Sequence, residues 1–92
     1  MNSAEVISLY EQIATLTRQM AAAARISDWD SLDRLELLCA TQARRVQAAT
    51  IPALSGANRL HKQDLLRQIL ANGREVQMMT SPWGSPETGT LQ

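Results

Sequence analysis

The chain has 92 residues, and its nine Lys and Arg balance its nine Asp and Glu to a formal net charge of zero. This length allows one small domain, and the balanced charge excludes an overall positive field that would attract nucleic acid directly. The single cysteine excludes a disulfide-stapled secreted scaffold, and 13 alanines beside only three aromatic residues leave a thin core.

The sequence favours a cytoplasmic protein with no membrane insertion. The first ten residues, "MNSAEVISLY", have no basic stretch of the kind that begins a secretory signal. No apolar run approaches the roughly 20 residues that cross a bilayer.

The first helix is predicted over residues 3–25. Asn2 can cap it in a capping box with Glu5, and Arg25 suits the negative helix end. Apolar residues repeat at spacings of three and four, which is typical of one helix face packed on a partner. These are Val6, Leu9, Ile13, Leu16, Met20 and Ala23.

A second helix, over residues 28–49, follows the polar break in "RISDWDSLDRLELL". Ser27 is the predicted N-cap, and capping and solvation account for Asp28, Asp30 and Asp33. The short break folds this helix back antiparallel on the first. Its inner face comprises Leu32, Leu35, Cys39, Gln42, Val46 and Ala49.

The segment "TIPALSGAN" predicts a second turn, with Ser55 or Asn58 capping a third helix. That helix carries two adjacent stripes, one of Leu65, Ile69, Asn72, Val76 and Met79 and one of Leu66, Leu70 and Gly73. Two prolines and two glycines after Met79 predict a flexible tail over residues 81–92. The predicted fold is all-α, an antiparallel three-helix hairpin or bundle over residues 1–80 with this tail.

No pattern in the sequence supports catalysis, a metal site or a cofactor. Cys39 and His61 are too few for a structural zinc site, and nothing nearby would complete a nucleophile and base pair. Cys39 is expected to be a small buried residue and His61 a boundary residue. Arg44 and Arg45 are expected on a solvated face, and no phosphate-binding glycine loop occurs.

The second and third helices carry more apolar stripes than a three-helix arrangement can bury. A groove between them could take an amphipathic partner helix, which needs anchors at helical spacing and no catalytic residue. The predicted partner-binding residues are Leu35, Leu38, Val46, Leu66, Leu70 and Gly73. The alternative is a homo-oligomerisation module in which a second copy covers the same stripes.

Trp29 has two interpretations. A residue in the first turn of the second helix can lie across the end of the first, which predicts a buried core anchor. The alternative is a direct contact with the partner.

Three segments carry a family resemblance: "DWDSLDRLE", "ARRVQAA" and "QDLLRQILANGREVQMM". Over roughly residues 5 to 80 the chain resembles the flagellar export chaperone family FliT. The resemblance implies a cytoplasmic helical chaperone that holds the C-terminal helical segment of the flagellar filament cap protein for type III export.

The resemblance also implies contacts with export ATPase components and the export gate, and in some relatives inhibition of the flagellar master transcriptional activator by protein contact. Relatives extend the third helix and add a short fourth helix that regulates access, whereas this chain ends in "SPWGSPETGTLQ". The groove is therefore either open in this chain or covered by a second copy.

Overall fold

The computed structural model describes residues 2–48 and 53–80, which form three helices. These are α1 (Ser3–Arg25), α2 (Trp29–Ala48) and α3 (Gly56–Thr80). The predicted all-α three-helix fold is confirmed, and the bounds of α1 match the sequence prediction. The predicted tail over 81–92 and the middle of the second turn lie outside the described residues.

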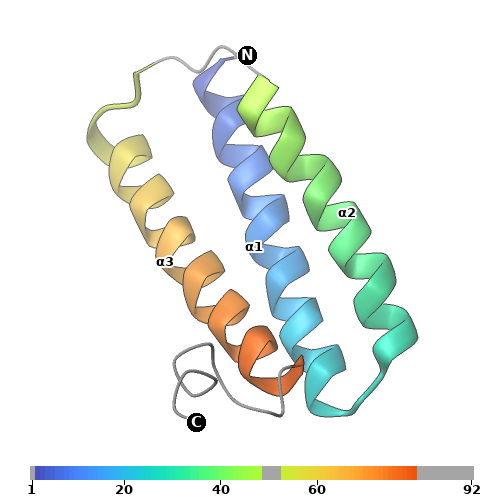
Figure 1. The fold of residues 1–92 in the computed structure, drawn as a ribbon. Helices are drawn as coiled ribbons and strands as arrows, with labels where there is room; N and C mark the ends of the chain where they lie inside the picture. Colours follow the sequence, from blue (N-terminus) through green and yellow to red (C-terminus); the bar gives the residue numbers. More distant parts are fainter. Residues whose placement is uncertain (1, 49–52, 81–92) are drawn as a thin grey trace, which may run out of the picture.

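Helix α1 lies between the other two helices (Figure 1). Consecutive helices are antiparallel, so α3 runs in the same direction as α1. Both α2 and α3 pack on α1, but no Cα atom of α2 comes within 8 Å of one in α3.

This arrangement concentrates the core on α1. Its eight buried residues are Val6, Leu9, Ile13, Ala14, Thr17, Ala21, Ala23 and Ala24. By contrast, α2 buries only Leu32, and α3 buries only Leu65 and Val76. A helix with two neighbours is shielded from solvent on two sides, whereas a helix with one neighbour is shielded on one side.

The start of α1 is fixed by the predicted capping box. The backbone N–H of Glu5 donates to Oδ1 of Asn2 at 2.8 Å, and the N–H of Asn2 donates to Oε1 of Glu5 at 2.9 Å. The two side chains thus satisfy two of the four N–H groups that have no backbone partner at a helix start.

The end of α1 is closed by two backbone hydrogen bonds across the turn. The N–H of Asp28 donates to the carbonyl of Ala23 at 2.9 Å, and the N–H of Ser27 donates to the carbonyl of Ala24 at 3.1 Å. This pairing is a Schellman ending, which requires a left-handed residue after the cap. Ser27 supplies it with a φ of 57°.

Asp28 ends α1 and also begins α2. Its Oδ1 accepts a hydrogen bond from the N–H of Ser31 at 3.2 Å. Hydrogen bonding from the Ser31 side chain, and then from its backbone, lowers the pKa of the Asp28 carboxyl. The prediction that Ser27 caps α2 is wrong, because an N-cap needs an extended backbone and Ser27 is left-handed.

The start of α3 rules out Asn58, which is one of the two predicted caps. The helix begins at Gly56, which has a φ of 58°, so Asn58 lies inside the helix and Ser55 directly precedes it. Glycine adopts this left-handed conformation at little cost.

Polar side chains join α3 to α1 along their length. Nδ2 of Asn72 donates to the hydroxyl of Thr17 at 3.3 Å, and that hydroxyl donates to the carbonyl of Ala14 at 2.9 Å. Nearer the other end, Nζ of Lys62 lies 5.3 Å from the centre of the Tyr10 ring. Asn72 therefore belongs on the inner stripe because it has a polar partner on α1.

Ser27→Gly is expected to stabilise the protein by roughly 0.5 to 1 kcal/mol. Glycine removes the steric cost of the left-handed conformation, which exceeds its added entropy in the unfolded chain. Urea unfolding followed by circular dichroism measures the change. Ser27→Ala is the control and should show no gain, and a destabilised glycine variant would contradict the assigned turn.

The melting temperature is expected to fall in acid because the pKa values of Asp28 and Glu75 lie below their ordinary values of 3.8 and 4.5. The unfolded chain then binds more protons, so this stabilisation is complete above the ordinary values and disappears as pH falls through the folded-state values. Thermal scans from about pH 7 to about pH 2 test this. The double variant Asp28→Asn, Glu75→Gln should show a flatter profile, and an equally steep one would refute the assignment.

Candidate partner-binding site

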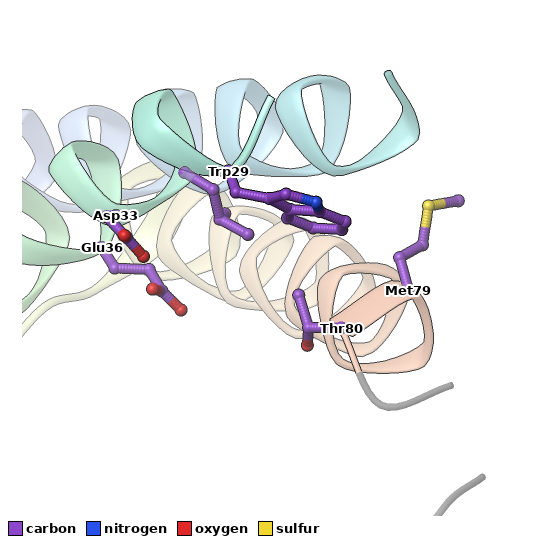
Figure 2. A pocket seen from close by; sticks show the side chains of 6 residues that line it. Trp29, Asp33, Glu36, Met79 and Thr80 are labelled. Atoms are coloured by element: carbon purple, nitrogen blue, oxygen red, sulfur yellow. The ribbon is translucent and has the colours of Figure 1, made fainter. Parts of the chain in front are cut away.

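A hollow of about 360 Å³ opens between the start of α2 and the end of α3. Its lining residues are Trp29, Leu32, Asp33, Glu36, Met79 and Thr80. Figure 2 shows the Trp29 indole reaching from α2 toward the last turn of α3, where Met79 and Thr80 lie. The hollow thus joins two segments that are distant in the sequence.

Trp29 is 45% exposed, so the prediction of a buried core anchor is wrong. As the first residue of α2, it points toward the last turn of α3 (Figure 2). Exposure of a large aromatic surface favours the alternative interpretation, in which the indole contacts a partner.

Asp33 and Glu36 give the hollow a negative side. They lie three residues apart on α2, so their side chains are neighbours on the helix surface (Figure 2). Neither carboxylate has a hydrogen bond or an ion pair with any residue in the described ranges. Burial, and secondly the charge of Glu36, raise the pKa of the nearby Cys39 thiol.

A small apolar cluster supports the hollow from beneath. It contains Ala21, Ala23, Ala24, Leu32 and Val76, with Met20 and Leu35 packed against it. The alanines let Leu32 of α2 and Val76 of α3 pack closely on α1 at this end of the molecule.

An ion pair fixes the end of α3 to the end of α1. The Arg25 guanidinium binds the Glu75 carboxylate through both oxygens, with Nη2 of Arg25 2.7 Å from Oε1 of Glu75. This hydrogen bonding lowers the pKa of Glu75 and raises that of Arg25. The pair links the end of α1 to α3 about one turn before Met79.

The predicted partner-binding residues of α2 fall on two different sides of that helix. Leu35 and Val46 are partly buried on the face toward α1. Leu38 is 54% exposed and follows Glu36 by two residues, which is about 200° around a helix. Leu38 therefore points away from the hollow.

The predicted residues of α3 lie in line with the hollow. Gly73 precedes Thr80 by seven residues, and Leu66 precedes Gly73 by seven, so the three share one side of α3. Leu70 is a neighbour of Leu66 and Gly73 on that side and is 62% exposed. A Cβ atom placed on Gly73 would meet no atom within 4 Å, so no packing inside the described chain requires glycine there.

The sequence patterns do not predict most of the hollow. Capping and solvation account for Asp33, a packing stripe accounts for Met79, and no pattern singles out Glu36 or Thr80. One available signal was the spacing of seven between Trp29 and Glu36, which places both on one side of α2.

The described residues contain no group of three or more His, Cys, Asp or Glu able to hold a metal ion. His61 instead lies 3.2 Å from a carboxylate oxygen of Glu11 on α1. Cys39 is partly buried on the inner face of α2. Within the same residues, no helix has the length and apolar character needed to span a bilayer.

Comparison with known proteins gives a consistent result. The model of one protein family, described as "Flagellar protein FliT", matches residues 7–85. A curated protein named "Flagellar protein FliT" from Yersinia enterocolitica serotype O:8 / biotype 1B is 35% identical over 78 residues. That match covers 80% of this chain and 62% of the relative, so the chain spans less than two thirds of the relative's length. No solved structure matches this chain.

Trp29→Ala is expected to cost about 1 to 2 kcal/mol of unfolding free energy, whereas Leu32→Ala should cost about 2 to 5. The reason is burial, since Leu32 is 3% exposed and Trp29 is 45% exposed. Chemical denaturation of both variants checks the order. A larger loss for Trp29→Ala would mean that the indole is part of the core.

Proposed function

Because this chain belongs to the FliT family of flagellar proteins, we propose that it is an export chaperone for the flagellar filament cap protein. It holds the C-terminal helical segment of that protein between α2 and α3 and delivers it to the type III export apparatus. Export ATPase components and the export gate are the proposed partners in delivery, and the cytoplasm is the proposed compartment.

The observation that carries this proposal is the uncovered side of α3 beside the hollow. Leu70 is 62% exposed, Leu66 is 36% exposed, and Gly73 on the same side of α3 faces open space. Because α2 and α3 do not pack on each other, neither helix covers the other's apolar side chains. A partner helix bound there would bury these exposed apolar side chains.

Gly73 gives the proposal a further support. Glycine in a helix interior costs about 1 kcal/mol relative to alanine, and nothing inside the described chain uses the space that it leaves. A partner backbone approaching closely at this point would use that space.

A second candidate function rests on a different surface. Leu37 is 66% exposed and Leu38 is 54% exposed, and Leu38 points away from the hollow. A second copy of the chain could cover these leucines and form a homo-oligomer, and an adaptor of this kind could act on the flagellar master transcriptional activator by protein contact. Light scattering of the wild type at tens of micromolar tests self-association.

Leu70→Glu is expected to weaken binding of the cap-protein segment by roughly tenfold or more, because it places a charge in the proposed apolar contact. Calorimetric titration with the synthetic C-terminal segment of the cap protein measures the dissociation constant. Leu38→Glu is the matched control, because it makes the same change at a similarly exposed leucine that points away from the hollow.

The control should bind the segment as the wild type does, and both variants should keep the wild-type melting temperature. Absence of any binding by the wild type would refute the proposed function. Equal losses in both variants would place the binding surface elsewhere on the molecule.

A further inference from the structure

The hollow combines features that a purely apolar anchor would not satisfy. One wall is the half-exposed indole of Trp29, and beside it lie the two carboxylates of Asp33 and Glu36 (Figure 2). Carboxylates that lose water without gaining a cation or a donor are costly. A leucine or phenylalanine seated here would bury apolar surface but would desolvate both acids.

Two arginines near this end of the molecule have other partners. Arg25 is bound to Glu75, and Nη2 of Arg34 donates to the Ser31 hydroxyl at 3.1 Å. Among the described residues, then, two adjacent negative charges beside an aromatic ring lack a counter-charge. Like charges at this spacing repel each other, and an incoming cation would relieve that repulsion.

A long cationic side chain matches every wall of the hollow. Its methylene stem can pack on Leu32 and Met79, while its charged head lies against the Trp29 ring and between the carboxylates. The guanidinium group is the better match, because it is planar, stacks on aromatic rings and binds carboxylates through two donors.

We propose that the hollow is a specificity pocket for an arginine or lysine side chain on the partner helix bound between α2 and α3. This inference rests on the proposed function, because it specifies one anchor of the same bound helix. The apolar surface at Leu66 and Leu70 then supplies the remaining anchors farther along α3. The partner segment is therefore amphipathic and carries a basic residue toward the end that meets Trp29.

The test uses the full chain and two kinds of probe. The first is a phage-displayed library of helical peptides with randomised positions, selected on the wild type. The second is the C-terminal segment of the cap protein, titrated with single Arg→Gln and Lys→Gln changes. The protein variants are Asp33→Asn with Glu36→Gln and, as a control with equal charge change, Glu11→Gln with Asp64→Asn.

Both residues of the control pair lie far from the hollow. Glu11 faces His61, and Asp64 accepts a hydrogen bond from Gln68. Melting temperatures of both double variants are measured alongside. They should match the wild type closely, since none of the four carboxylates is buried.

The expected result is that selected peptides share a basic residue at one fixed position. Their affinity should fall roughly tenfold for the Asp33→Asn, Glu36→Gln variant and remain unchanged for the control. One Gln change in the cap-protein segment should weaken wild-type binding and have no further effect on that variant.

Two outcomes would overturn the inference: selected peptides with no fixed basic residue, or equal affinity for the wild type and the Asp33→Asn, Glu36→Gln variant. If the cap-protein segment binds both proteins equally, the specificity pocket is refuted while the proposed function stands. If that segment does not bind but library peptides show the acid-dependent basic anchor, the proposed function is refuted and the pocket stands.

Discussion

Placing α1 between α2 and α3 is the constraint on which the rest of this structure depends. Each outer helix packs on α1 alone, and their Cα atoms stay more than 8 Å apart. The inner faces of α2 and α3 therefore pack on α1, and the remaining sides of both helices are exposed. A closed three-helix bundle would bury those sides and leave no place for another polypeptide.

The same constraint explains where stability and binding capacity reside. Alanines in the second half of α1 let Leu32 of α2 and Val76 of α3 pack on that helix in one cluster, and the Arg25 and Glu75 pair adds a contact between α1 and α3. Directly above this packed region lies the hollow. A binding surface built on a packed support loses less entropy on binding, which suits the role that we propose for it.

Hydrophobic spacing predicted the helices and the faces that meet α1, because those faces obey a period that a single helix carries in its own sequence. Spacing could not say on which flank of α1 the third helix would pack. Two adjacent stripes on α3 were available, and the contact of Asn72 with Thr17 belongs to only one of them. Such a match between polar residues 55 positions apart has no local signature. The hollow could not be predicted from the sequence for the same reason, since its walls come from the start of α2 and the end of α3.

The turn at Asp28 has a consequence for the order of folding. It joins α1 and α2 through hydrogen bonds between close neighbours, so this hairpin closes a very short loop, whereas the contacts of α3 with α1 span 50 or more residues. Short loops close faster and at lower entropic cost than long ones. We therefore expect the hairpin to form first and α3 to dock on it afterwards.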